Sequence, residues 1–588
     1  ILFDSLALKG LIGFIVPDTW TQSVYALALR ELVLSKTSVN RLIALNSGVF
    51  PDATVDTLIF VIEKNTPSVE HNIDIFHQED NFLIQPSPSY LLKQSLFLNE
   101  PSMRINFLTS PQVRLLNQKI TSNIFTVDDM FETTRGINAY DKARGQSLDI
   151  ISSRAYHSSY KKSEKFKPEL MGSDIGRYEI SWNGDHWIKY GSWLAAPREP
   201  RFFSQVKLMA RKILSNGRIV SVVDKDSYYV DQQIYIGILR PNQDHKISLY
   251  YVTAILNSSA TNFVYTSRYR EKDVVFPQMT VEAFTQLPIR RIDFTTPAAE
   301  RAARVEEAIA AYAGGDSGGA LALARAAIDA GKTDVVHDLL AHLAEQMIAL
   351  NKTKQAEVKR FLGWVEEVLG IAEGIDSLTG KSILQNYLGD YQKGQPETPW
   401  AEFHYRLFQN RRRFGVALAE IEGQIESEYE RSLATLVPIK RDLARTDALI
   451  DKIVYRLYGL TDDEIELIER PQYEQALADA KAQVVANDEI KDDDARIDKI
   501  AESILPAAQR FFDRVEPKTD EEMLDAELPG WNTLPPQAPT FLLTGDYNLR
   551  TLPAHMDFST AVIPYTKAVE VALYQRIFIP FRDESGNT

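Results

Sequence analysis

Three short, continuous apolar runs in the first 66 residues constrain the fold most. They are Leu11–Pro17, Asn40–Leu45 and Thr57–Glu63, and each has the length of a β-strand. Continuous apolar runs of this length indicate strands buried on both faces. The stretch Ser23–Ser35 has apolar residues at helical spacing. Strand, helix, strand, turn and strand predict the end of an open α/β sheet over residues 1–66, and we expect the front of that sheet to lie outside the chain.

The rest of the chain predicts further domains with different character. Residues 67–125 are broken by five prolines, which suits a connector with short helices. Residues 126–295 are rich in Tyr, Trp, Gly and Ser with short β-like runs, which indicates an irregular α+β domain. Residues 296–470 have apolar positions at helical spacing and predict a mostly α-helical region, followed by an acidic helical extension over 471–588.

The helical region divides further by its periodicity. Two longer helices are expected over Tyr405–Tyr458, or one helix with a break or kink at Pro438. The shorter helices expected before them are Ala299–Ala313, Ala320–Ala330, Asp334–Leu350 and Lys354–Leu369. The sequence therefore predicts a multidomain protein.

Composition excludes some classes of site. The 588 residues contain no cysteine, which removes disulfides, iron–sulfur clusters and thiolate zinc sites and suits a reducing cytoplasm. The net charge is −15, but acidic runs crowd the last third while basic residues recur between Arg135 and Arg291. No apolar run approaches the roughly 18–20 residues that span a bilayer, so no membrane is expected. The opening Ile1-Leu2-Phe3 suggests a fragment that starts inside a domain.

Two tempting motifs fail on spacing. Pro51-Asp52 followed by Glu63-Lys64 resembles half of a metal-dependent nuclease site, which needs Glu-x-Lys. A one-residue shift along a strand turns the lysine to the opposite face, so the nuclease interpretation is rejected. His337 and His342 are five residues apart, and none of the nine histidines stands in a known metal-site pattern. The sequence therefore predicts no metal site.

A longer combination of motifs points to one family. It begins with Gly10–Trp20 (G-L-I-G-F-I-V-P-D-T-W), continues through a helix with Leu29-Arg30-Glu31, and ends with Gly48–Thr57 (G-V-F-P-D-A-T-V-D-T). This resembles the part of N6-adenine DNA methyltransferases that follows their Asn-Pro-Pro-Tyr motif, in the class with a TaqI-like target-recognition domain. That class is found in type IIG restriction–modification enzymes and BREX-type phage-defence methyltransferases. Further matches run loosely to about residue 470, among them Thr134-Arg135-Gly136-Ile137, Gly172–Tyr178, the Leu256-Asn257-Ser258 turn and His337–Leu340.

The resemblance implies a base-flipping reaction. Such enzymes extrude an adenine and methylate its amine from S-adenosylmethionine, and the pocket recovers part of the extrusion cost by stacking the flipped base. The family's stacking phenylalanine matches Phe50, with Val49 and Pro51 shaping the loop. Phe50 follows a buried strand, where α/β sheets present ligand contacts, although it could also simply close the sheet edge. The chain has neither the Asn-Pro-Pro-Tyr nor the Phe-x-Gly-x-Gly signature, so the cofactor is expected to be bound mainly outside it and this chain alone to be inactive.

The resemblance places target recognition in residues 126–295, with double-stranded DNA as the partner. Arginine and lysine bind phosphates and guanine edges, and a share of surface charges touches nothing. Arg177 beside Tyr178 could instead brace two segments. The predicted DNA-binding residues are Arg135, Lys142, Arg144, Lys161, Lys162, Arg177, Lys207, Arg211, Lys212, Arg268 and Arg270.

Two functions stay open from the sequence. The first is the C-terminal part of an adenine-specific DNA methyltransferase, with or without a fused endonuclease. The second is a DNA-recognition and partner-docking subunit of a defence complex that has no catalysis. Docking of a defence protein, autoinhibition and DNA mimicry are all open as roles of the acidic extension.

Overall fold

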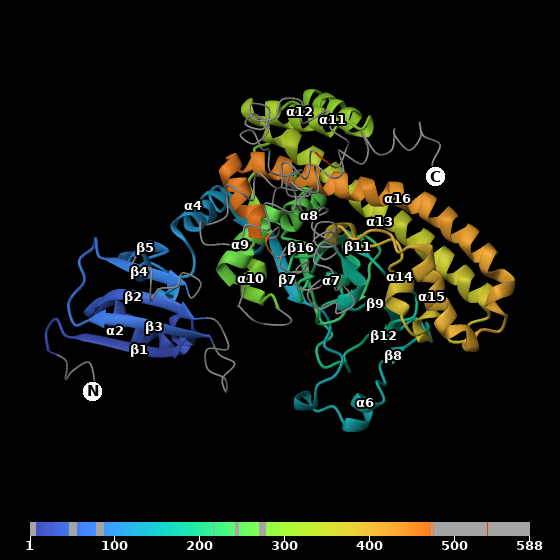
Figure 1. The fold of residues 1–588 in the computed structure, drawn as a ribbon, viewed down its shortest axis with the longest axis horizontal. Coiled ribbons are helices and arrows are strands. Elements are labelled where there is room, and N and C mark those ends of the chain that lie inside the picture. The colour runs from blue at the N-terminus through green and yellow to red at the C-terminus, as the bar shows by residue number, and fades with distance from the viewer. Residues whose placement is uncertain are drawn as a thin grey trace, which may run out of the picture. The chain divides into compact units, whose positions relative to one another are not determined.

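The computed structural model describes residues 7–45, 56–77, 88–215, 217–241, 246–269 and 278–471, together with residues 474 and 538 (Figure 1). The chain separates into two compact units. The first combines Ile1–Ser122 with Val264–Pro277, and the second combines Asn123–Phe263 with Gln278–Thr588. The acidic extension predicted over 471–588 lies almost wholly outside the described residues.

The first unit is built on a five-stranded mixed sheet. Its strands in spatial order are β1 (Leu11–Pro17), β3 (Thr57–Glu63), β2 (Ser38–Leu45), β4 (Asn72–His77) and β5 (Tyr90–Lys93). Strand β3 is antiparallel to both β1 and β2, so β1 and β2 run in the same direction. The crossover between them contains α2 (Leu27–Lys36). The three predicted strands are therefore confirmed, two of them at the predicted residues.

Strand β1 differs from the prediction in its burial. Leu11, Phe14 and Ile15 are 60%, 38% and 45% exposed, whereas Leu58 in the neighbouring β3 and Leu42 in β2, the next strand of the sheet, are fully buried. The difference arises because β1 is the edge strand and pairs only with β3. A strand with an apolar sequence thus has an exposed edge among the described residues.

Short helices complete the first unit. Arg30 in α2 is buried and donates hydrogen bonds to the carbonyls of Trp20 (2.7 Å), Ser23 (2.6 Å) and Ser102 (3.0 Å). Its guanidinium thereby ties α2 to two loops. The remaining helical elements are η1 (Asp18–Thr21), η2 (Val24–Ala26), α3 (Ser95–Leu98), η4 (Pro101–Met103) and α4 (Pro111–Ile120).

The second unit contains two four-stranded sheets. One has the order β14 (Ser221–Asp224), β13 (Lys207–Arg211), β16 (Ile234–Leu239) and β7 (Phe131–Arg135), and every pair is antiparallel. The other has the order β15 (Tyr229–Val230), β9 (Phe166–Leu170), β12 (Trp187–Lys189) and β8 (His157–Ser158). Leu170, Ile188, Met209, Val222 and Ile236 meet in one core, so the two sheets pack as a single β-rich body. Two-stranded sheets join β10 (Ile175–Gly176) to β11 (Glu179–Ile180) and β6 (Ile124–Thr126) to β17 (Pro288–Arg290).

Helices form the rest of the second unit. Helices α13 (Thr333–Leu369) and α16 (Leu418–Leu457) lie side by side along much of their length (Figure 1). Helix α16 continues through Pro438, with Leu436 and Leu443 buried on either side of the proline. The other helices are α5 (Val127–Met130), α6 (Leu148–Ser152), α7 (Arg201–Ser204), α8 (Leu249–Asn257), α10 (Val281–Thr285), α11 (Ala298–Ala313), α12 (Ser317–Asp329), α14 (Lys381–Gln385) and α15 (Trp400–Asn410). Helix α9 (Ser259–Tyr269) begins in the second unit, and its residues from Val264 onward belong to the first.

Gly136 tests the packing of this unit. A Cβ added at Gly136 would meet the backbone oxygen of Asp231 at 2.0 Å. We expect Gly136→Ala to lower the free energy of unfolding by about 1–3 kcal/mol, as overpacking does. Urea unfolding measures the loss. The matched control is Gly363→Ala in α13, where the added Cβ meets nothing within 4 Å and helix propensity favours alanine by about 1 kcal/mol. Equal stability of the two variants would contradict this packing.

Candidate functional site

A buried ion pair joins the β-rich body to α16. The Arg177 guanidinium, between β10 and β11, donates hydrogen bonds to the Asp447 carboxylate and to the Asn257 carbonyl. The two charged side chains are only 1% and 4% exposed. Burial disfavours the charged guanidinium, but the neighbouring Asp447 carboxylate holds the pKa of Arg177 above its ordinary value. Arg177 is therefore charged and internal, as the bracing alternative for this residue requires.

A second carboxylate on α16, one turn further along the helix, accepts hydrogen bonds from the start of α9. Asp451 accepts hydrogen bonds from the Ser259 backbone N–H at 2.8 Å and from the Ser259 hydroxyl at 3.0 Å. Asn257, at the end of α8, pairs with both the N–H (2.8 Å) and the carbonyl (2.9 Å) of Ser221 in β14. One helix thus holds the β10–β11 turn and the α8–α9 junction through two acidic residues four positions apart.

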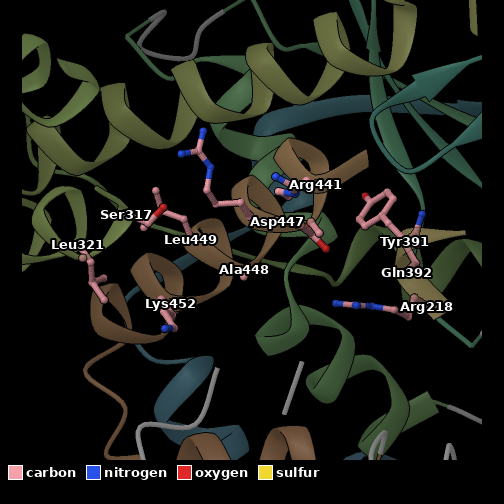
Figure 2. A pocket seen from close by; sticks show the side chains of 13 residues that line it. Arg218, Ser317, Leu321, Tyr391, Gln392, Arg441, Asp447, Ala448, Leu449 and Lys452 are labelled. Atoms are coloured by element: carbon pink, nitrogen blue, oxygen red, sulfur yellow. The ribbon is translucent and has the colours of Figure 1, made fainter. Parts of the chain in front are cut away.

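A basic pocket lies beside this ion pair. It has a volume of about 370 Å³ and is lined by the start of α12, by Tyr391 and Gln392, and by one face of α16 (Figure 2). Four cationic residues line it, and the one carboxylate among its described lining residues is Asp447, which Arg177 already neutralises. The cations are Arg218, Arg441, Arg445 and Lys452. Two of these cations pair with acids outside the lining, Arg445 with Asp442 at 3.2 Å and Arg218 with Asp451 at 3.8 Å.

The predicted DNA-binding residues fall into four groups in the structure. Six are exposed on the surface, two are partly buried, two are buried, and one lies outside the described residues. The exposed residues are Arg135, Lys142, Arg144, Lys161, Lys162 and Arg268, the partly buried ones Arg211 and Lys212, the buried ones Arg177 and Lys207, and the residue outside is Arg270. The segment around α6, which follows Lys142 and Arg144, extends away from the sheets (Figure 1).

Two of these assignments are corrected. Arg177 and Lys207 have no exposed donor with which to reach DNA in this conformation. The Lys207 ammonium donates hydrogen bonds to the Asp224 carboxylate and, at 2.9 Å, to the Phe203 carbonyl, and burial lowers the pKa of Lys207. Both residues support the fold from inside, because their partners are buried acids.

The predicted base-stacking loop lies outside the described residues. Phe50, Val49 and Pro51 all belong to the stretch between β2, which ends at Leu45, and β3, which begins at Thr57. Strands β2 and β3 pair directly at Leu45 and Thr57, so the two ends of this loop are held together by the sheet. The role of Phe50 stays a prediction.

Sequence spacing missed a cluster of possible metal ligands. His157, Glu169 and His186 each present a ligand atom, and these atoms all lie within 4.8 Å of one another. His337, which the sequence singled out, has a different role, because its Nε2 accepts a hydrogen bond from the Ser248 N–H at 2.9 Å. The gaps of 12 and 17 residues in the cluster match no linear motif, and only the strand register could have revealed it.

Comparison with known proteins identifies the β-rich body. Residues 167–289 match the family model of the TaqI-like C-terminal specificity domain. A Methanocaldococcus jannaschii protein named as a type II restriction enzyme and methyltransferase, RM.MjaORFECS2P, is 27% identical over 292 residues, which cover 48% of this chain and 23% of that protein. The chain therefore carries a DNA-recognition domain related to those of restriction–modification systems.

Two solved structures align with part of this chain at low TM-scores. The type IIG restriction endonuclease BpuSI is 10% identical, with 51% of this chain and 42% of that chain covered at a TM-score of 0.24. The type IIL restriction–modification enzyme MmeI, solved in complex with DNA, is 11% identical, with 58% and 47% covered at a TM-score of 0.28. No described helix has the length and apolar character needed to cross a membrane.

The Arg177–Asp447 pair gives a prediction on stability. Arg177→Met leaves the Asp447 carboxylate buried without its partner, so we expect a loss of about 3–5 kcal/mol in the free energy of unfolding. The double variant Arg177→Met/Asp447→Leu should recover much of that loss, because no buried charge is left unpaired. Chemical denaturation measures both.

The control for these two variants is an arginine–carboxylate ion pair on the surface. Arg360 is 37% exposed and contacts Glu357 and Glu428, so Arg360→Met should cost at most about 1 kcal/mol. A loss in Arg177→Met no larger than that in Arg360→Met would show that the buried pair does not hold the unit together.

Proposed function

We propose that this chain recognises a DNA sequence and presents an adenine for N6 methylation from S-adenosylmethionine, as part of a restriction–modification or phage-defence system. The match of residues 167–289 to a TaqI-like specificity domain carries the proposal. The relative named as a restriction enzyme and methyltransferase supports it. The cofactor is expected to bind mainly to residues outside this chain.

The edge strand of the first unit supports a methyltransferase role. Strand β1 exposes apolar side chains at Leu11, Phe14 and Ile15, and one of its edges pairs with no strand in the part of the chain that the structure describes. Exposed apolar edges of this kind pair readily with another strand. The arrangement suits a sheet that is continued, past β1, by the S-adenosylmethionine-binding half of a methyltransferase. In such a sheet, β2 and β3 would hold the Phe50 loop beside that half.

The exposed basic residues of the second unit form the proposed contact with the DNA backbone. Lys161 and Lys162 lie between β8 and β9, Lys142 and Arg144 lie before α6, and Arg135 ends β7. Loops on a rigid scaffold are where recognition residues usually stand. Arg144 also donates a hydrogen bond to the Ala195 carbonyl at 2.8 Å, which fixes the base of its loop.

DNA binding tests this surface directly. We expect Lys161→Ala/Lys162→Ala and Arg135→Ala to weaken binding and to flatten the dependence of log K on log salt by about 0.9 for each phosphate that is no longer neutralised. Fluorescence anisotropy at several salt concentrations measures both quantities. The charge-matched control is Arg304→Ala on α11, an exposed arginine paired with Glu300, which should leave the salt slope unchanged. The same slope in all variants would remove these residues from the DNA surface.

The Phe50 loop gives a separate prediction on catalysis. In a preparation that also supplies the S-adenosylmethionine-binding half, we expect Phe50→Ala to lower adenine methylation strongly while changing DNA affinity little. The physical reason is the loss of base stacking, which is worth about 1–3 kcal/mol per base. Transfer of a labelled methyl group to DNA measures the turnover.

The conservative variant separates stacking from structure. Phe50→Trp keeps an aromatic face and should retain most of the activity that Phe50→Ala loses. Normal turnover in Phe50→Ala would disprove the assignment. Tight DNA binding without any methyl transfer in the supplemented preparation would favour the non-catalytic recognition subunit instead.

A further inference from the structure

The strand register brings two histidines and a glutamate onto one face of the second sheet. In the pairing of β12 with β8, Ile188 lies opposite His157. His186 precedes β12, and its carbonyl accepts a hydrogen bond from the Glu169 N–H of β9 at 3.1 Å. Residues opposite one another, and residues two apart along a strand, share a face. The three side chains therefore converge because of the sheet, although they are distant in sequence.

The distances within the cluster suit a small divalent ion. Oε2 of Glu169 lies 2.9 Å from Nε2 of His157 and 3.3 Å from Nε2 of His186. Zinc binds imidazole nitrogen and carboxylate oxygen at about 2.0–2.2 Å, which separates the donor atoms of a tetrahedral site by about 3.3–3.5 Å. Side-chain movements of roughly half an ångström would therefore open the cluster to that geometry, with the fourth position left for water.

The imidazole nitrogen of His186 and the carboxylate of Glu169 face each other in the interior of the cluster. Nε2 of His186 is buried and faces Oε2 of Glu169 at 3.3 Å, the long end of hydrogen-bonding distance. Glu169 itself is almost wholly buried, with its side chain 2% exposed. A buried nitrogen lone pair and a buried carboxylate aimed at the same point are costly unless a cation or proton lies between them.

A neighbouring tyrosine orients one of the histidines. Nδ1 of His157 lies 2.8 Å from the Tyr140 hydroxyl, which also accepts a hydrogen bond from the Tyr156 N–H at 2.9 Å. Metal-bound histidines typically donate their second ring N–H to such an oxygen, which fixes the ring with the other nitrogen facing the metal. The Tyr140 and Tyr156 rings are stacked at 5.5 Å, so the hydroxyl has a rigid support.

We propose that His157, Glu169 and His186 form a binding site for one zinc-class divalent cation that links β8, β9 and β12. Two imidazoles and one carboxylate favour zinc or a similar transition metal over magnesium or calcium, which prefer all-oxygen sites. The connection between β8 and β9 carries Lys161 and Lys162, so the ion fixes both ends of this basic loop. The metal assignment rests on the cluster geometry and is independent of the proposed DNA contacts.

Metal binding by the purified whole chain tests the assignment. The protein is freed of metal with a chelator, exchanged into chelator-free buffer and titrated with Zn²⁺ or Co²⁺. We expect one equivalent to bind, Co²⁺ to give the visible absorption of a tetrahedral site that Zn²⁺ abolishes, and the melting temperature to rise with zinc and fall again with chelator. Mass spectrometry of the bound metal gives the stoichiometry.

Variants locate the ion in this cluster. His186→Ala should abolish the Co²⁺ absorption and the thermal shift, and its side chain is 28% exposed, which makes it the least disruptive ligand to remove. Tyr140→Phe keeps the ring and should weaken zinc binding by about 10–100-fold. The matched control is His404→Ala, because His404 pairs with Glu422 at 3.1 Å without a third ligand and its loss should leave binding unchanged.

Three results would overturn the proposal. Absence of bound metal and of a thermal shift in the wild-type protein leaves only a His–Glu–His hydrogen-bond network. Metal binding that His186→Ala and Tyr140→Phe leave unaltered places the ion elsewhere. Equal loss of binding in His404→Ala shows that the effect is not specific to the cluster. Circular dichroism of each variant confirms that it is folded.

Discussion

The buried carboxylates of α16 are the constraint on which the second unit depends. Asp447 and Asp451 lie one helical turn apart, and each is satisfied from outside α16: Asp447 by the Arg177 guanidinium of the β10–β11 turn, and Asp451 by the Ser259 N–H and hydroxyl at the α8–α9 junction. Removing either partner would leave a charge or a polar group buried without compensation, which costs far more than the pair contributes. The recognition domain is therefore held in one position on the helix by geometry that hydrophobic contact alone would not specify.

This arrangement explains why two of the sequence elements that resemble the recognition-domain family are internal. The segment Gly172–Tyr178 contains a 3-10 turn and β10, and its Arg177 bonds Asp447 of α16. Asn257 of the Leu256-Asn257-Ser258 turn bonds both backbone groups of Ser221. These polar residues thus hold the scaffold, while Lys161 and Lys162 are exposed on the loop between β8 and β9. This separation of internal polar residues from exposed basic residues fits a recognition domain in which loop residues can vary while the core stays the same.

The sequence predicted local structure well where a single segment determines it. The strands Leu11–Pro17 and Thr57–Glu63 were found at the predicted residues because contiguous apolar runs need no partner to be recognised. Asp334–Leu350 and Lys354–Leu369 were expected as two helices but form one, since polar Asn351 is buried and donates hydrogen bonds to the Met347 and Tyr178 carbonyls. The exposure of β1 and the burial of Lys207 depend on residues far away in the chain, so no local pattern contained them.

The long helix α13 also has a mechanical consequence. Its 37 residues span about 55 Å at 1.5 Å per residue. Leu339 and Leu343 near one end are buried in the second unit, and Phe361, Val365 and Leu369 near the other end belong to a separate apolar cluster with α15 and α16. A rigid rod of this length turns an angular change of about 5° at one end into a displacement of about 5 Å at the other. The orientation of α13 where it packs in the recognition domain therefore fixes the position of the distal cluster.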